Sequence, residues 1–135
     1  MRMLGRLIVV LAVTIAGCTS TAPQPPATTV PITSFQMVAG KWAGTVVGLS
    51  GSKDEGDSIE VTIGEDGSYD FGMFRTIGMF GGKGQFGLKD GKLTSQSQRG
   101  NAEYTLSERG GRQYLRGEGL FENNRKVTAD LTRKR

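Results

Sequence analysis

Acidic side chains are the groups in this sequence that could most readily do chemistry, and they occur in two patterns. Asp54, Glu55 and Asp57 are close enough together to suggest a calcium loop, but they lack the alternate-residue ligand spacing of such loops. Carboxylate pairs for glycoside hydrolysis could be drawn from a second set, although alternating β-strands always supply several such pairs. That set is Glu103, Glu108, Glu118 and Glu122. We therefore interpret the first group as a solvated loop and assign no catalytic role to the second.

A glycine-rich run from Gly78 to Gly84 invites comparison with a phosphate-binding loop. That motif needs glycine at the position of Ile77 and serine or threonine at the position of Gly84, and the sequence has neither. The run instead favours a bulge or a tight bend, where glycine permits unusual backbone angles. If the segment protrudes, Met79 and Phe80 are its most favourable contact residues.

The chain contains no histidine and a single cysteine, Cys18. Histidine is the commonest general base and a common metal ligand, so its absence excludes Ser-His-Asp and Cys-His catalysis. Thiolate zinc sites need several cysteines, and an internal disulfide needs two. We therefore expect no enzymatic activity, no metal and no cofactor, and a domain stabilised by its packed core alone.

The N-terminus has the composition of an export signal. Arg2 and Arg6 precede an uncharged apolar run, residues 7–16, which ends in small residues before Cys18. Crossing ~30 Å of hydrocarbon takes ~20 apolar residues, so this run is too short for a transmembrane helix. We predict that residues 1–17 are a signal peptide that is removed.

The four residues Ile15-Ala16-Gly17-Cys18 resemble the lipobox of bacterial lipoproteins. The resemblance implies that Cys18 becomes the first residue of the mature protein and carries two or three acyl chains, palmitate among them. Two chains hold a protein firmly at a membrane, whereas one holds it only marginally. Thr19 stands where an Asp would favour inner-membrane retention, so the periplasmic face of the outer membrane is the expected location.

The charge balance of the mature chain gives no reason to expect a nucleic-acid partner. The full chain has 17 Lys and Arg against 13 Asp and Glu, and the loss of Arg2 and Arg6 leaves 15 against 13. A nearly neutral domain has little general attraction for nucleic acid or anionic lipid. The expected partners are the membrane, through the acyl chains, and either a small apolar ligand or an envelope protein.

Residues 18–34 differ in composition from the rest of the mature chain. They hold all four prolines and no charged residue. Such segments favour extended, unpacked conformations. We predict a disordered tether over residues 18–34 and one globular domain over residues 35–135.

Apolar residues in residues 40–133 alternate with polar ones, as in half-buried strands. Asp-Gly, Gly-Gly and Asn-Asn pairs between these segments are typical of tight hairpin turns. The pattern predicts strands at about 40–49, 58–64, 68–75, 76–80, 84–89, 92–98, 101–108, 113–121 and 125–133, with residues 76–89 either two short strands or one bent at Gly81-Gly82. Because closure removes exposed edges, we predict an all-β fold, a small antiparallel up-and-down β-barrel of about eight strands, over a two-sheet sandwich.

The first predicted strand, Gly40-Lys41-Trp42-Ala43-Gly44, resembles the Gly-x-Trp start of lipocalins and avidins. The resemblance implies that Trp42 plugs the closed end of the barrel. A barrel shorter than a lipocalin could be filled entirely by side chains. The aromatic residues that either line a ligand site or form the core are Trp42, Tyr69, Phe71, Phe86, Tyr104 and Phe121.

Two functions stay open at this point. The first is a non-catalytic binding or interaction domain for a small ligand or an envelope component. The second is an inhibitor of an envelope hydrolase, such as a lysozyme or a protease, because some known inhibitors of these enzymes are small β-barrel lipoproteins. In that case we expect the contacts on loops such as 50–57 or 78–84.

Overall fold

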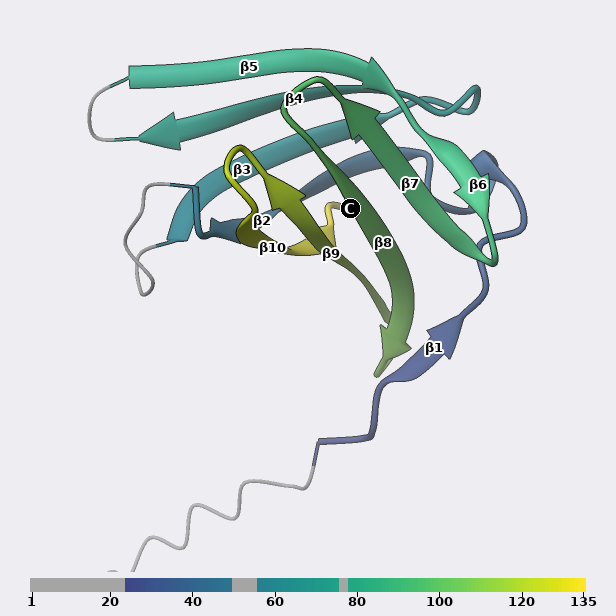
Figure 1. Ribbon diagram of the computed structural model, residues 1–135. Helices are drawn as coiled ribbons and strands as arrows, with labels where there is room; N and C mark the ends of the chain where they lie inside the picture. The colour runs from purple at the N-terminus through teal and green to yellow at the C-terminus, as the bar shows by residue number, and fades with distance from the viewer. Residues whose placement is uncertain (1–23, 50–55, 76–77) are drawn as a thin grey trace, which may run out of the picture.

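Ten antiparallel strands and one short 3-10 helix account for the regular structure of the computed structural model, which describes residues 24–49, 56–75 and 78–135 (Figure 1). The all-β prediction is confirmed, whereas the predicted signal peptide and Cys18 lie outside the described residues. In chain order the elements are β1 (Thr28–Val30), η1 (Phe35–Met37), β2 (Gly40–Val47), β3 (Gly56–Ile63), β4 (Ser68–Arg75), β5 (Gly78–Gln85), β6 (Gly87–Lys89), β7 (Lys92–Ser97), β8 (Gly100–Arg109), β9 (Arg112–Phe121) and β10 (Arg125–Arg133).

The strands form one sheet that curls into a half-barrel (Figure 1). Each strand from β2 to β5, and each from β6 to β10, pairs with the next, and β10 pairs with β2. β5 and β6 stand at the two ends of the strand order although only Phe86 separates them in the chain. If they are counted as one bent strand, the order from β2 to β10 is the predicted up-and-down arrangement of about eight strands.

The bend in this strand is at Phe86, so the prediction of a bend at Gly81-Gly82 is wrong. Gly81 and Gly82 lie in the regular ladder with β4, and a Cβ atom on Gly82 would come within 2.8 Å of the Phe71 ring. Phe86 is 5% exposed, and its N–H still donates to the Gly67 carbonyl at 2.9 Å. Burial of the Phe86 ring directs the chain into the corner, and Gly82 leaves space for the neighbouring ring.

The predicted hairpin turns are confirmed. Asn123 and Asn124 have φ angles of 61° and 59°, and Gly110 and Gly111 have φ angles of 56° and 72°. Positive φ at both central residues is the geometry of the tight turns that match the twist of antiparallel strands. These turns set the register that brings Leu106, Leu115 and Leu131 side by side on β8, β9 and β10.

The core is a single cluster on the concave side of the sheet. Its apolar members alternate along each strand with polar residues on the outer face, as the period-two pattern requires. Removal of this apolar surface from water is the main favourable term in folding. The buried members are Ile32, Val38, Trp42, Val61, Ile63, Phe86, Leu93, Leu106, Leu115 and Leu131.

Trp42 closes one end of the half-barrel, as the sequence predicted. Its side chain is 0% exposed, and its indole N–H donates to the Val38 carbonyl at 2.8 Å. The Arg133 guanidinium lies 5.6 Å from the indole ring and donates to the carbonyls of Met37, at 3.1 Å, and of Ala39. The segment that carries η1 is therefore tied to both the first and the last long strand. We refer to this region as the closed end.

The folded domain begins earlier in the chain than the composition of residues 18–34 predicted. β1 pairs with residues 106–108 of β8, Ile32 is 2% exposed, and the Ile32 N–H donates to the Gly91 carbonyl at 2.8 Å. The prediction of a disordered tether is thus wrong for residues 28–34, and the domain begins before residue 35. Proline suggested an unpacked chain, but β1 ends just before Pro31, where the missing N–H interrupts no ladder.

Candidate interaction surface

Five of the six aromatic residues singled out in the sequence gather in the core. Trp42 and Phe86 are buried, and the others pack against the same cluster while partly exposed: Tyr69, Phe71 and Tyr104. The rings contact each other directly, with 4.3 Å between the centroids of Tyr69 and Phe86 and 5.3 Å between those of Phe86 and Tyr104. Phe121, at the far end of β9, is only half-buried and is not part of this cluster. These aromatics pack on one another and so act as core.

Tyr104 carries a hydroxyl whose titration is perturbed by its surroundings. Burial raises its pKa above the ordinary value of 10.0, and the nearby Ser95 hydroxyl opposes that shift. The ring of Tyr104 lies over Gly117, where a Cβ atom would approach it to 2.4 Å. The phenol is therefore neutral at physiological pH and held by packing, which favours a structural role over proton transfer.

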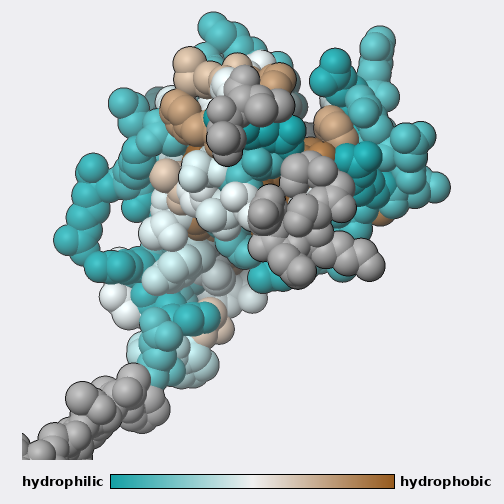
Figure 2. All heavy atoms as spheres, turned by 90° about the vertical axis from the view of Figure 1, so that its left-hand side faces the viewer, coloured by the Kyte–Doolittle hydropathy of each residue, from teal (hydrophilic) through white to brown (hydrophobic). Residues whose placement is uncertain are grey.

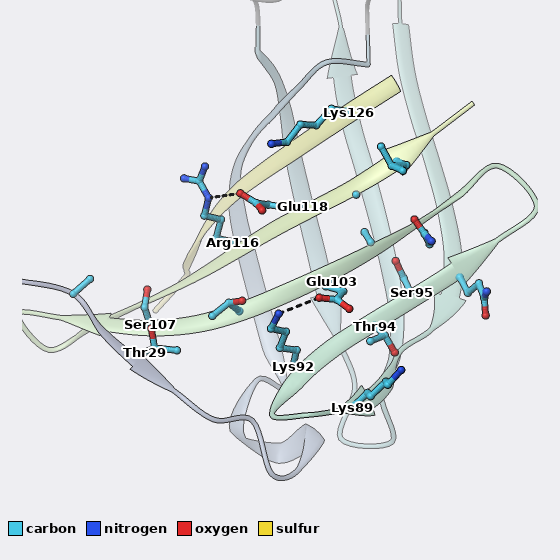
Figure 3. A pocket seen from close by; sticks show the side chains of 17 residues that line it. Thr29, Lys89, Lys92, Thr94, Ser95, Glu103, Ser107, Arg116, Glu118 and Lys126 are labelled. Atoms are coloured by element: carbon cyan, nitrogen blue, oxygen red, sulfur yellow. Dashed lines mark hydrogen bonds and ion pairs between the residues drawn. The ribbon is translucent and has the colours of Figure 1, made fainter. Parts of the chain in front are cut away.

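A groove runs across the outer face of β7, β8 and β9 and holds two of the four carboxylates that the sequence offered for catalysis (Figure 3). It has a volume of about 890 Å³, is open to solvent, and none of the buried core residues lines it. Glu103 and Glu118 face each other across β8 and β9 within it. Lys92 pairs with Glu103 at 3.0 Å, whereas Lys89 and Lys126 add two further cations to the lining of the groove.

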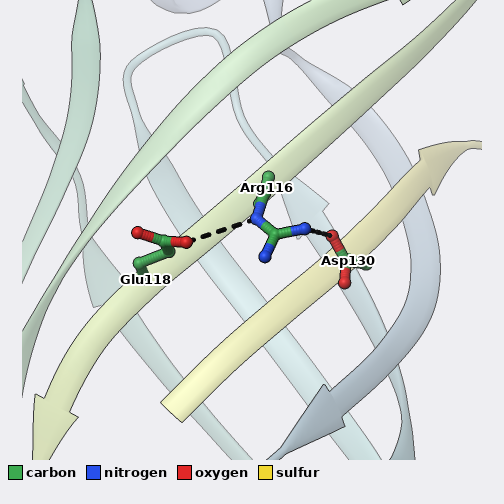
Figure 4. Close-up of polar contacts among 3 residues, drawn as sticks. All are labelled: Arg116, Glu118 and Asp130. Atoms are coloured by element: carbon green, nitrogen blue, oxygen red, sulfur yellow. Dashed lines mark hydrogen bonds and ion pairs between the residues drawn. The ribbon is translucent and has the colours of Figure 1, made fainter. Parts of the chain in front are cut away.

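Arg116 forms two ion pairs on the other side of this groove. Its guanidinium lies 3.3 Å from a carboxylate oxygen of Glu118 and 3.3 Å from one of Asp130 (Figure 4). All three side chains are more than half exposed. Exposed ion pairs of this kind contribute only ~0–1 kcal/mol to stability.

The other two glutamates considered for catalysis are also paired. Glu108 accepts a hydrogen bond from Gln113, and Glu122 pairs with Arg99. None of these carboxylates has the buried setting that a general acid needs.

The acidic group considered for calcium is only partly described. Asp54 and Glu55 lie outside the described residues, while Asp57 is paired with Arg75 at 2.7 Å. In residues 24–49, 56–75 and 78–135, no three acidic, histidine or cysteine side chains are grouped so that they could hold a metal ion.

The β4–β5 hairpin carries three of the five exposed large apolar side chains of the described residues. Met79 is 71% exposed, Phe74 49% and Phe80 47%. Phe74 and Met79 are direct cross-strand neighbours on the outer face, and Phe80 is opposite Met73 on the other face. We call Phe74, Met79 and Phe80 the β4–β5 patch. Figure 2 views this side of the molecule, with apolar residues in brown gathered near its top.

An ion pair lies next to this patch, near the turn of the β4–β5 hairpin. Asp57 on β3 and Arg75 on β4 have side chains only 15% and 21% exposed, and the Arg75 guanidinium lies 5.6 Å from the Phe80 ring. The Arg75 Nε is buried without a hydrogen-bond partner among the described residues. The pair joins two strands at the end of the sheet opposite Trp42, which we call the rim. The ion pair therefore fixes the backbone positions of the strands that carry the β4–β5 patch.

Met79 and Phe80 were predicted contact residues, whereas Phe74, Asp57 and Arg75 were not predicted as parts of this surface. A signal for the ion pair was present in the sequence. Asp57 continues the inward-facing positions of Ile59, Val61 and Ile63, and Arg75 continues those of Phe71 and Met73. A charged residue in the inward register of two neighbouring strands predicts that the two are paired.

No helix in the described residues is long and apolar enough to span a bilayer. No protein-family model matches the chain, and the comparisons with curated proteins and with solved structures found no match either.

Proposed function

We propose that this chain is a lipid-anchored bacterial envelope protein whose half-barrel domain is non-catalytic and binds another protein through the β4–β5 patch. The observation that carries the proposal is the exposure of Phe74, Met79 and Phe80 on one hairpin. Burial of one such side chain typically contributes ~1.5–3 kcal/mol, and interfaces rely on a few apolar and aromatic anchors of this kind. A cluster of exposed apolar side chains of this type indicates a surface that contacts another molecule rather than one that faces only water.

A partner protein fits the described residues better than a small apolar ligand does. Five of the six aromatic residues that could have lined a ligand site belong to the core cluster or pack against it. A ligand site of lipocalin or avidin type typically needs a concave pocket of ~300 Å³ or more that buries most of the ligand. The Gly-x-Trp resemblance is accounted for by the plug that Trp42 forms, which requires no ligand.

Inhibition of an envelope hydrolase is a narrower form of the same proposal. An inhibitor presents a preformed hairpin or loop to its target, and its backbone moves little on binding. The β4–β5 patch, next to which Arg75 pairs with Asp57 of β3, is such an element. We keep this as the second candidate, with the hydrolase as the partner.

Photo-crosslinking in the host cell tests the contact surface. A photoreactive amino acid replaces Met79, and in a matched chain it replaces Leu120, which is 48% exposed on β9. We expect a discrete protein adduct from position 79 and none from position 120, and we expect Phe74→Ser to abolish it. Adducts from position 120 alone would overturn the assignment. An adduct of small-molecule mass at position 79 would favour the ligand alternative.

The anchor is tested separately, because Cys18 does not depend on the patch. Cys18→Ser should move the protein from the membrane fraction to the soluble fraction, since the acyl chains supply the membrane affinity. Metabolic labelling with a fatty-acid analogue should mark the unaltered chain and leave the variant unmarked. An unlabelled wild-type chain would contradict the lipobox interpretation, and a location at the inner membrane would contradict the sorting predicted from Thr19.

A further inference from the structure

One edge of β5 is without a strand partner in the described structure. β5 pairs with β4 on one side and stands at the end of the strand order on the other. The Phe86 N–H donates to Gly67, which places residue 86 in a hydrogen-bonded pair, and such pairs alternate along an antiparallel ladder. By this alternation Phe80, Gly82 and Gly84 direct their backbone groups to β4. Met79, Gly81, Lys83 and Gln85 direct theirs to the open edge.

The nearest strand in the barrel order does not cover this edge. β7 pairs with β6 through residues 92–94 only, and Ser95 to Ser97 have no partner on that side within the described chain. No pairing joins β7 to β5 in the described residues, and β7 meets this end of the sheet only through β6. Unpaired strand edges are templates for the addition of another strand, and proteins usually protect them with proline, bulges, lysines or a covering element.

Of the usual protections, β5 carries only a lysine, Lys83. Gly81, Gly82 and Gly84 have no side chain to obstruct an approaching backbone, and no proline occurs in the strand. Lys83 is the only charged residue of β5, and its side chain is 82% exposed, with Asp70 at a loose 3.6 Å. An added strand would therefore lie beside the apolar Met79 and Phe80 at one end and beside an available cation at the other.

A second copy of this chain does not match these features. Antiparallel self-pairing about Gly81 would place Met79 opposite Lys83 of the other copy. β5 contains no acidic residue that could form an ion pair with Lys83 of the other copy. Charge complementarity instead favours a partner segment that has a carboxylate near Lys83 and an apolar residue near Met79.

We infer that the β5 edge accepts an extended segment of the partner protein as an additional strand, with an acidic residue facing Lys83 and an apolar residue beside Met79. This inference rests on the proposed function and specifies how the partner binds. Backbone hydrogen bonds to Met79, Gly81, Lys83 and Gln85 supply affinity in this mode, and the flanking side chains supply selectivity.

Amide hydrogen exchange of the soluble domain, residues 24–135, tests the inference. The probe is an extended peptide of alternating Val and Thr, about as long as β5, with one central Glu. Without the peptide, the amides of Met79, Gly81, Lys83 and Gln85 should exchange fast while those of Phe80, Gly82 and Gly84 are protected. Saturating peptide should slow the first set at least about tenfold, as expected for newly paired strand amides.

Two variants at Lys83 separate the backbone contribution from the charge. Lys83→Thr keeps the edge N–H and should weaken the protection, whereas Lys83→Pro removes that N–H and should abolish it. Neither change touches the ladder with β4, and Trp42 fluorescence checks that the fold is kept. If Lys83→Pro unfolds the domain, a charge reversal replaces it as the test. The Lys83→Glu variant should not be protected by the acidic peptide, and a peptide with a central Lys should restore the protection.

Several outcomes would overturn the inference. These are the absence of protection at millimolar acidic peptide, equal protection by acidic and basic peptides, and retained protection in a folded Lys83→Pro variant. Protection that rises with protein concentration without peptide would assign the edge to a second copy. Protection by phosphatidylethanolamine and phosphatidylglycerol vesicles would assign it to a membrane. A crosslink from position 79 without edge protection would leave the proposed function standing and exclude strand addition.

Discussion

At the closed end of the half-barrel, Trp42 and Phe86 are 0% and 5% exposed, whereas at the rim Phe74 and Phe80 are 49% and 47% exposed. The two ends use the same alternating strands and similar residues. They differ in what covers them. Residues 28–39 cross the closed end and pack onto it, and no described segment performs that role over the β4–β5 patch.

The contrast indicates that the closed end contributes to folding stability and the rim to binding. Apolar burial at the closed end is completed inside the chain, so it contributes to folding in the absence of any partner. Apolar surface at the rim is left for a contact made outside the chain. Substitutions at the closed end should therefore lower the free energy of unfolding, and those at the β4–β5 patch should mainly affect binding.

The largest effect is expected at Trp42. Trp42→Ala removes the plug, the hydrogen bond to Val38 and the ring under Arg133. Such truncations cost about 3–5 kcal/mol, and a small domain has only ~5–15 kcal/mol in total. Urea unfolding followed by circular dichroism should show little folded protein at physiological temperature. In the unaltered chain, Trp42 emission should be blue-shifted and resist iodide, and a water-like emission would overturn the plug assignment.

The second effect tests whether residues 28–34 belong to the closed end. Ile32→Ala should lower the free energy of unfolding by ~2–5 kcal/mol, because Ile32 is buried in the main cluster. A fragment that starts at Ser34 should be destabilised to a similar extent relative to one that starts at Gln24. Thr29→Ala, at an exposed position of β1, serves as the control. Equal stability of the two fragments would show that the tether extends to residue 34 after all.

The third effect compares a rim ion pair with an exposed one. Asp57→Ala leaves the Arg75 guanidinium without its carboxylate in a largely buried setting, which should cost about 1–3 kcal/mol. Glu103→Ala breaks the exposed Lys92 pair and should cost only ~0–1 kcal/mol. Chemical denaturation of both variants measures the difference. Equal small losses would mean that Arg75 and Asp57 do not hold the rim.

The strands, the turns and the burial of Trp42 could be predicted from the sequence because a short local pattern specifies each of them. Alternation gives the inward face, Asn-Asn and Gly-Gly give the turns, and Gly-x-Trp gives the plug. The sequence did not predict the corner at Phe86, since the bend is caused by burial of one ring and not by a glycine. It also failed at Ile32, because proline content indicates chain stiffness and says nothing of a neighbouring apolar residue that fits a core.

The site was less predictable than the fold for a similar reason. Exposure of Met79 and Phe80 was expected from the glycine-rich run, but the surface depends on which strand pairs with which. Phe74 joins Met79, and Asp57 joins Arg75, only through the registers of β4 with β5 and of β3 with β4. Register is a property of the assembled sheet, so a single strand pattern does not specify it.

The smallest effect concerns Asp66, in the turn at the closed end between β3 and β4. Its carboxylate accepts hydrogen bonds from the Ser68 hydroxyl at 2.6 Å and the Ser68 N–H at 3.0 Å, and these contacts lower its pKa below the ordinary 3.8. Because the folded-state pKa is depressed, the carboxylate stabilises the fold above pH 3.8, and this contribution is lost as the pH falls through the folded-state value. The stability advantage of the unaltered chain over Asp66→Asn should be constant near neutral pH and shrink below pH 3.8, as measured by urea unfolding across that range. Ser68→Ala removes the first of the two donors and should weaken the same pH dependence. An advantage that grew on acidification would show that the Ser68 contacts favour the protonated acid and would reverse the assignment.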